Sequence, residues 1–209
     1  MTRLVDLYFS EADSRAIADA VTRAESTTSG EIAVEVVESV SNWNLQRIAG
    51  IFIGFCVGAA ISLWLAHDTG WGMYYDITQG LLWGCIGGLL GYVVARYVIG
   101  SRNNRASVVW ETAIKRFAQL PATRGNTAVL IFIGLEESHG VLVADQKIAE
   151  KVVQEEWDQM QEELTRNLRL GRHSEGIIAS VSKLGTVLAQ HFPRQSDDTN
   201  EMPNAPKIG

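Results

Sequence analysis

Two long apolar runs interrupt a chain that is otherwise rich in charged residues. The run IAGIFIGFCVGAAISLWLA contains no acidic or basic residue, and QGLLWGCIGGLLGYVVARYVI carries only Arg96, close to its end. A helix needs about 20 predominantly apolar residues to cross a bilayer, and an arginine near its end can extend to the interface. The pattern therefore predicts a transmembrane helical hairpin with spans Ile48–Ala66 and Gln79–Ile99. Two buried core helices are the alternative, although uncharged runs of this length are rare in soluble domains.

Glycines recur at every fourth position in both spans. Rows of small residues let helix backbones approach closely in lipid. We therefore expect the two spans to pack against each other, and the same rows offer a surface for a homo-oligomer. The expected packing residues are Gly50, Gly54 and Gly58 in the first span and Gly80, Gly84 and Gly88 in the second, with Gly87 and Gly91 offset beside them.

Basic residues flank the spans on one side only. Arg47 precedes the first span, Arg102 and Arg105 follow the second, and the loop 67–78 contains no Lys or Arg. The positive-inside rule then places both termini in the cytoplasm and the loop outside. Trp71, Tyr74 and Tyr75 in this loop suit a membrane interface.

The segment before the hairpin has the pattern of one helix and one strand. Ser10, with Asp13 three residues later, predicts a capping box. Apolar residues then follow at helical spacing, and EIAVEVVES alternates as a strand. The expected inward positions are Ile17, Ala20, Val21 and Ala24 in the helix and Ile32, Val34 and Val36 in the strand.

The segment after the hairpin supplies the remaining elements. A helix is predicted over 105–120, a strand buried on both faces over 127–135, and a third strand from Val141. Helical patterns follow over 146–169, in one or two pieces, and over 177–192. In the helix predicted over 105–120, the expected apolar positions are Val108, Val109, Thr112, Ile114, Phe117 and Leu120.

These patterns predict an α/β fold, a three- to four-stranded mixed sheet flanked by helices, with the two-helix transmembrane hairpin inserted in it. The expected organisation is a first part of the domain over 1–44, the hairpin over 45–100, the remainder of the domain over 101–192 and a polar, irregular tail over 193–209. The one helix and one strand of the first segment cannot bury a core alone, so the two segments are expected to fold together.

Charge and cysteine content narrow the functional classes. The net charge of −6 argues against nucleic acid, which favours a clustered basic face. Cys56 and Cys85 both lie inside the apolar runs, where they are expected to be small hydrophobic residues rather than a redox pair. The N-terminal sequence MTRLVDLYFSEADSR lacks the apolar stretch of a signal peptide.

Several segments resemble the TPM-domain family, which includes a thylakoid lumen protein, a photosystem II repair protein and a modulator of acetylcholine receptors. The resemblance covers residues 8–44 and 105–209. It rests on FSEADSRAIADAVTRAESTTSGEIAVEV, on RFAQLPATRGNTAVLIFIGLEESHGVLVAD, and on the pieces EEWDQM, LGRHSEGI and HFPRQSDDTNEMP. Short bacterial members are the most similar. The resemblance implies an α/β sandwich, here at a bacterial inner membrane.

The chain departs from the family pattern at three places. Thr127 stands where the family often has a glycine after Asn126. The stretch 144–148 reads Ala-Asp-Gln-Lys-Ile, where the family often has Gly-Asp-x-Gly-Ile. A hairpin between the first strand and the next helix is also not the usual arrangement.

Relatives in the TPM family are described as calcium-binding and, in one case, as acid phosphatases. The resemblance therefore implies these two functions as candidates for this chain. Asp145, at the end of a strand, and Glu31, at the start of another, are the candidate metal ligands. Calcium requires six to eight oxygen ligands. The departures at Ala144 and Lys147 count against such a site, and the alternative is that Asp145 caps the helix beginning near Gln146.

Phosphatase chemistry has little support from residue types. Outside the apolar runs there is no cysteine, and no glycine-rich phosphate loop is present. His139, His173 and His191 have no nearby Asp or Cys partner at ligand or triad spacing, and His67 is expected at the membrane surface. Structural roles are expected for all four. Trp157, in an acidic helix, is expected to be a core or interface anchor rather than a ligand contact.

The preferred function is a membrane-anchored interaction module that assists the assembly, repair or quality control of other membrane proteins. Its expected partners are the lipid bilayer and those proteins, and not nucleic acid. The alternatives are a metal-dependent acid-phosphatase-like hydrolase and a calcium-binding regulatory domain. A transporter is disfavoured because the two spans offer no internal polar path.

Overall fold

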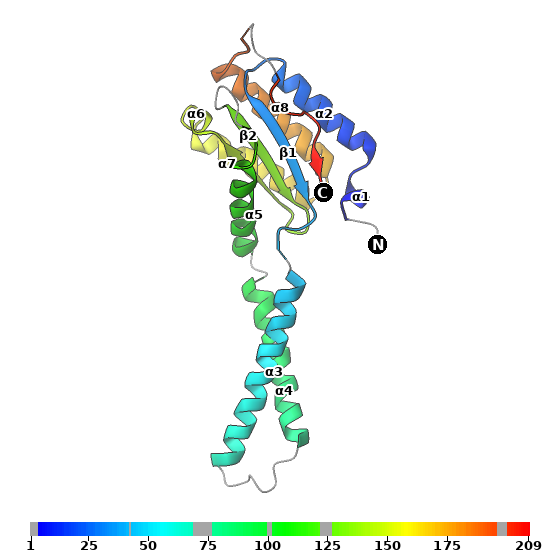
Figure 1. The fold of residues 1–209 in the computed structure, drawn as a ribbon, viewed down its shortest axis with the longest axis vertical. Helices are drawn as coiled ribbons and strands as arrows, with labels where there is room; N and C mark the ends of the chain where they lie inside the picture. The colour runs from blue at the N-terminus through cyan, green and yellow to red at the C-terminus, as the bar shows by residue number, and fades with distance from the viewer. Residues whose placement is uncertain (1–3, 42, 69–76, 100–101, 122–126, 196–199) are drawn as a thin grey trace. The chain divides into compact units, whose positions relative to one another are not determined.

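The computed structural model describes residues 4–41, 43–68, 77–99, 102–121, 127–195 and 200–209. The chain forms two compact units (Figure 1). One combines Met1–Val40 with Ala106–Gly209, and the other is Ser41–Arg105.

The first unit contains a four-stranded mixed sheet in the order β3-β2-β1-β4, which confirms the predicted α/β class. Its strands are β1 (Glu31–Val37), β2 (Ala128–Gly134), β3 (His139–Ala144) and β4 (Lys207–Ile208). Strand β1 pairs in parallel with both β2 and β4, whereas β2 and β3 are antiparallel. All residues of β2 are buried, as expected for a strand covered on both faces.

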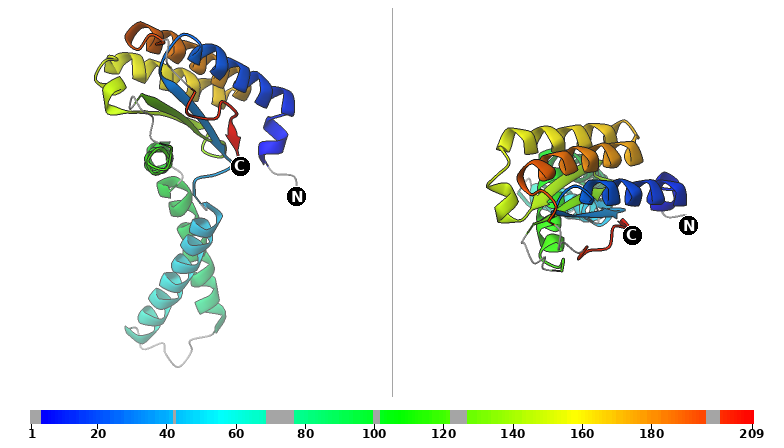
Figure 2. Two further views of the ribbon diagram at one scale, coloured as in Figure 1. Left: turned by 45° about the horizontal axis from the view of Figure 1, so that its top comes forward. Right: turned by 90° about the horizontal axis from the view of Figure 1, so that it is seen from above.

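Helices cover both faces of this sheet (Figure 2). The main core joins alternate residues of β1 and β2 to α2 (Glu11–Glu25), α7 (Gln154–Arg169) and α8 (His173–His191). On the opposite face, Val109 and Ala113 of α5 (Arg102–Phe117) pack with Leu130 and Phe132 of β2. The short helices α1 (Leu4–Tyr8) and α6 (Gln146–Ala149) complete the unit.

The start of α2 confirms the predicted capping box. The Ser10 hydroxyl accepts from the Asp13 N–H at 3.2 Å, and the Asp13 carboxylate accepts from the Ser10 N–H at 2.9 Å. These reciprocal bonds satisfy two N–H groups that the helix itself leaves without partners. The side-chain bond from Ser10 also lowers the pKa of Asp13.

Two expectations for this unit are wrong. Ile114 is exposed, because the inward face of α5 follows the four-residue row Val109, Ala113 and Phe117. The C-terminal residues are not irregular throughout, because they include β4. Its two residues alone lack the alternation that predicts a strand, and they pair only because β1 offers an open edge.

The second unit is a pair of helices, α3 (Trp43–Asp68) and α4 (Ile77–Val94), with α4 continuing into a π-helix, η2 (Ala95–Ile99). Two stretches are long and apolar enough to cross a membrane, Leu45–Leu65 and Thr78–Tyr97. Only 11% and 17% of their hydrophobic windows are buried, unlike the core helix of a soluble protein. Residues 69–76, with the aromatic residues predicted to lie at an interface, fall outside the described part of the chain.

Candidate functional site

The two helices of the hairpin cross with their backbones in contact. A Cβ atom on Gly54 would overlap the carbonyl oxygen of Gly87, and one on Gly58 would overlap that of Trp83. At Gly50, a Cβ would lie 3.0 Å from the Gly91 carbonyl oxygen. Only glycine permits these approaches, so the row on α3 forms the crossing surface.

On α4, Gly87 and Gly91 make the closest approach. Gly84 instead faces a side chain of α3, since a Cβ on it would lie 2.7 Å from the Phe55 ring. A Cβ on Gly88 would make ordinary contacts with Ile51, at 3.4 Å from its carbonyl oxygen and 3.6 Å from its side chain. Gly80 lies in the first turn of α4. Residues three apart on a helix, such as Gly84 and Gly87, point in directions that differ by about 60°. The two glycine rows of α4 are therefore neighbours, and the sequence spacing alone does not show which row faces α3.

The glycine rows therefore serve the packing within one hairpin. Beside the crossing lies an apolar groove of about 480 Å³, lined by both helices. The glycines of the crossing also line this groove, namely Gly50, Gly54, Gly58, Gly87 and Gly91, so a homo-oligomer through these rows stays a prediction.

Asp145 directly precedes α6, but its side chain does not cap that helix. The carboxylate accepts from the Ala128 N–H at 2.8 Å, and the Asp145 N–H donates to the Ala128 carbonyl at 2.9 Å. The expected side-chain cap is therefore wrong. Because β3 runs antiparallel to β2, the end of β3 brings Asp145 beside the start of β2, where the Ala128 amide is the nearer donor.

Glu31 is buried at the start of β1, where it holds the C-terminal segment. Its two carboxylate oxygens accept from the backbone N–H groups of Glu201 and Met202 at 3.2 and 3.3 Å. Glu31 also pairs in register with Ala128, so Glu31 and Asp145 flank the same residue of β2. With strands about 4.8 Å apart, their backbones are separated by roughly 10 Å.

In the described part of the chain, these two carboxylates are not brought together as calcium ligands. Each is engaged by backbone amides, and a hard cation would need six to eight oxygen ligands around it. Within the described ranges, no group of three or more His, Cys, Asp or Glu side chains could hold a metal ion.

Glu25 is a buried acid that the sequence reasoning missed. It ends α2, and one carboxylate oxygen accepts from the Ile32 N–H at 2.9 Å, while the other has no hydrogen-bond partner in the described structure. Burial, reinforced by the nearby charge of Glu31, raises the pKa of Glu25 to about 7. The available signal was its spacing, since Glu25 continues the inward row of Ile17 and Val21 at four-residue intervals.

A cavity of about 190 Å³ lies beside the outer edge of β1. Glu35, buried on this face, makes ion pairs at 3.5 Å with both Arg116 and Lys207. The remaining walls are largely apolar and come from β1, β2, the chain after α5 and the C-terminal segment. The described lining thus places one carboxylate between two cations, an arrangement that can bind and orient a chain.

The histidines and Trp157 have structural surroundings. The His173 ring packs edge-on to Tyr8, with centroids 4.4 Å apart, and burial lowers its pKa. His139 begins β3 and His191 ends α8. His67 lies in the last turn of α3. Trp157 is half-buried and packs against the main core of the α/β unit, the position of a core anchor.

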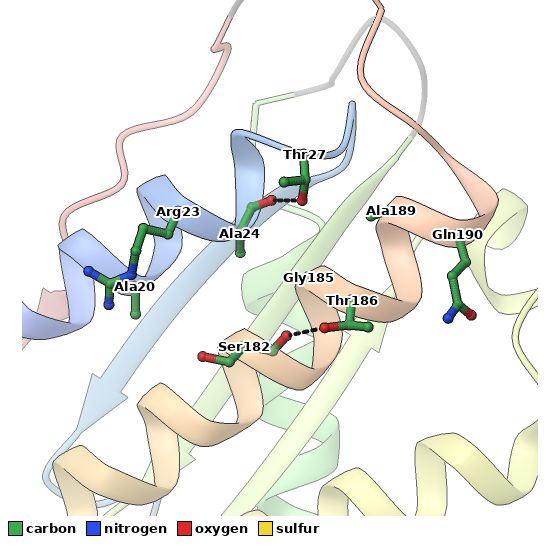
Figure 3. Close-up of a pocket in the computed structure, with 9 residues that line it drawn as sticks. All are labelled: Ala20, Arg23, Ala24, Thr27, Ser182, Gly185, Thr186, Ala189 and Gln190. Carbon is green, nitrogen blue, oxygen red and sulfur yellow. Dashed lines mark hydrogen bonds between the residues drawn. The ribbon is translucent and has the colours of Figure 1, made fainter.

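A surface groove of about 480 Å³ runs between α2 and α8 (Figure 3). Small residues allow the helices to meet closely, since a Cβ on Gly185 would lie 2.6 Å from that of Ala24. The Thr27 and Thr186 hydroxyls donate to helix carbonyls at 2.9 and 3.0 Å, so their protons are already used. Among the described residues that line this groove, Arg23 is the one that carries a charge.

Comparison with protein-family models finds no match, and comparison with curated proteins finds none. Among solved structures, the chain is similar to the NMR structure of the BA42 protein from the psychrophilic bacterium Bizionia argentinensis. The TM-score is 0.60 at 21% sequence identity, over 97% of this chain and 96% of that chain. At this identity the likeness concerns the fold alone.

Proposed function

We propose that this protein is a membrane-anchored, TPM-like interaction module that assists the assembly, repair or quality control of other membrane proteins. The supporting observation is the position of two long apolar helices between β1 and α5 of an α/β unit. Large hydrophobic side chains remain exposed along both helices, for example Phe52 at 68% and Leu89 at 66%. Such a surface is stable in lipid and costly in water.

The α/β unit supports a binding role rather than catalysis. Three of its buried acids, Glu25, Glu31 and Glu35, engage backbone amides or basic side chains within the protein. The resemblance of residues 8–44 and 105–209 to the TPM family supports the same interpretation. No contact among the described residues favours the hydrolase or the calcium-binding alternative.

Membrane fractionation tests the anchoring. The full chain is expected to stay in the membrane pellet after carbonate extraction. Val57→Lys places a charge near the middle of α3, which costs about 2.5–3.5 kcal/mol on insertion scales, so a larger soluble or degraded fraction is expected. Leu7→Lys, at a residue 72% exposed in α1, is the matched control and should behave as wild type. Complete extraction of the wild-type chain would contradict anchoring.

Site-specific photocrosslinking in native membranes tests the interaction role. A photoreactive residue at Leu82, which is 60% exposed on α4, should give reproducible adducts with other membrane proteins. Adducts with lipid alone would count against this role. Steady phosphomonoester hydrolysis that survives further purification and is lost in Asp145→Asn would favour the hydrolase instead.

A further inference from the structure

The outer edge of β1 is only partly covered by another strand. Strand β1 has seven residues, whereas β4 has two and pairs with Glu35 and Val36. The Val36 carbonyl accepts from the Gly209 N–H at 3.0 Å, and the Glu38 N–H donates to the Gly209 carbonyl at 3.3 Å. An edge of this kind can accept a strand from another chain.

A side chain, not a strand, covers the beginning of the same edge. The Glu31 N–H donates to Thr127 at the start of β2, so the N–H of Ile32 points to the opposite, outer side of β1. This outward N–H donates to the Glu25 carboxylate. A carboxylate and a two-residue strand therefore occupy this edge at Ile32 and at Glu35 to Glu38, and a longer segment could replace them.

The C-terminal segment Asn200–Gly209 is held by backbone bonds as well as by the buried Met202 side chain, the Lys207–Glu35 ion pair and a bond from Asn204 to Thr22. Glu31 binds the N–H groups of Glu201 and Met202, and β1 pairs with the backbone at the end of the segment. Such bonds do not depend on the side chains of the bound segment. Another extended segment can therefore form the same bonds in the same place.

The C-terminal segment leaves space in the groove that it occupies. The 190 Å³ cavity is lined by Leu120 and Pro121, by Met202 and Pro203 of the C-terminal segment, and by Ala33 of β1. Ala205 also lines it, and its methyl group is small. A longer apolar side chain at the Ala205 position would have room to enter.

Charge adds a second requirement at a neighbouring position. Lys207 pairs with Glu35, while its own side chain is 71% exposed. Arg116 makes an ion pair with the same carboxylate from α5. When the C-terminal segment leaves, Arg116 continues to neutralise Glu35, and a basic residue of an incoming segment can take the place of Lys207.

We propose that the outer edge of β1 and the cavity beside it form a peptide-binding groove, for which the C-terminal segment Asn200–Gly209 is an intramolecular competitor. The partner is an extended protein segment that runs parallel to β1. It carries a basic residue opposite Glu35 and a bulky apolar residue two positions earlier. This inference deepens the proposed interaction role by naming its surface.

The test uses the full chain in detergent with two substitutions confined to the C-terminal segment, Met202→Asp and Lys207→Glu. These leave the groove intact while weakening its competitor. The probe is a labelled peptide of residues 200–209, NEMPNAPKIG, measured by fluorescence anisotropy. An attached competitor acts at an effective concentration on the order of mM. The peptide should therefore bind the doubly substituted protein at least about tenfold more tightly than wild type.

Two substitutions in the peptide test which side chains the groove recognises. The peptide carrying A205L should bind about tenfold more tightly, because the added carbon atoms are removed from water in the cavity. The peptide carrying K207E should bind at least about tenfold more weakly, and Glu35→Lys in the protein should reverse that preference. Equal binding of all three peptides, or none by a doubly substituted protein with native circular dichroism, would overturn the proposal.

A second measurement does not depend on the doubly substituted protein folding. Ala205→Leu in the otherwise natural full chain should fill the cavity and slow hydrogen exchange of the Glu38 and Gly209 amides by about tenfold. Unchanged or faster exchange would contradict the cavity as a side-chain pocket. Neither measurement involves a bilayer, so failure here would leave membrane anchoring, tested by fractionation, unaffected.

Discussion

At the scale of single residues, the most informative feature is a carboxylic acid placed among apolar groups. Glu25 is 9% exposed and faces Ile32, and Glu31 and Arg194 are the charged groups around it. Desolvation opposes its ionisation more strongly than the Ile32 N–H favours it, so its pKa rises from 4.5 to about 7.

This residue predicts a dependence of stability on pH. The folded protein retains the Glu25 proton to a higher pH than the unfolded chain does, so stability should fall as pH rises from about 4.5 to about 7. Glu25→Gln removes this titration and should raise the free energy of unfolding at pH 8 by about 1–3 kcal/mol, with little effect at pH 4.5. Denaturant titrations at both values measure it.

The control for this prediction is Glu155→Gln, which alters an exposed acid in the first turn of α7. It should leave the difference in stability between the two pH values unchanged. A Glu25→Gln protein with the wild-type pH dependence would show that Glu25 does not ionise in this range.

At the scale of elements, α3 and α4 pack with their backbones in contact. The effect of a substitution on this packing should depend on which glycine is altered. Gly87→Ala would place a methyl group on the Gly54 carbonyl, so the helices must separate. We expect a loss of about 1–3 kcal/mol, the usual cost of overpacking. Gly88→Ala, whose methyl would lie 3.4 Å from the Ile51 carbonyl oxygen, is the matched control and should be nearly neutral.

Thermal unfolding in detergent, followed with a thiol-reactive dye, measures this effect, since Cys56 and Cys85 both lie in the hairpin. Equal melting temperatures for the two variants would contradict the crossing at Gly87.

The attachment of the C-terminal segment is a second property of elements. Glu31→Ala removes the acceptor of the Glu201 and Met202 N–H groups and should loosen the segment by about 1–3 kcal/mol. Hydrogen exchange of these two amides should accelerate, whereas Glu136→Ala, at an exposed turn position, should not change it. Unchanged exchange in Glu31→Ala would mean that other contacts hold the segment.

At the scale of the whole molecule, the order of elements constrains topology. The hairpin lies between β1 and α5, and both belong to one folded unit. Two spans return the chain to the side from which it started. A reporter after Gly209 should therefore give a cytoplasmic signal and one at residue 72 an external signal, as the flanking arginines predict. A cytoplasmic signal at residue 72 would refute this topology.

Local patterns accounted for much of the fold. The Ser10–Asp13 capping box and the buried run of β2 were both predicted, because each depends on neighbouring residues. The sequence left open whether 146–169 forms one helix or two, and the structure shows two, α6 and α7. The candidate site was less accessible. Asp145 was identified as a strand-end acid, but its partner Ala128 lies 17 positions away and is met only through strand pairing.

The sequence by itself determined that two helices are long and apolar enough to cross a membrane and that they interrupt an α/β unit, because hydrophobic length and periodicity are properties of consecutive residues. Only the tertiary structure decided which glycines of α4 touch α3, that Glu25 is buried, and that the last residues complete the sheet as β4. These features arise from contacts between distant segments. Two glycine rows about 60° apart, or a two-residue strand, have no local signature that would distinguish them.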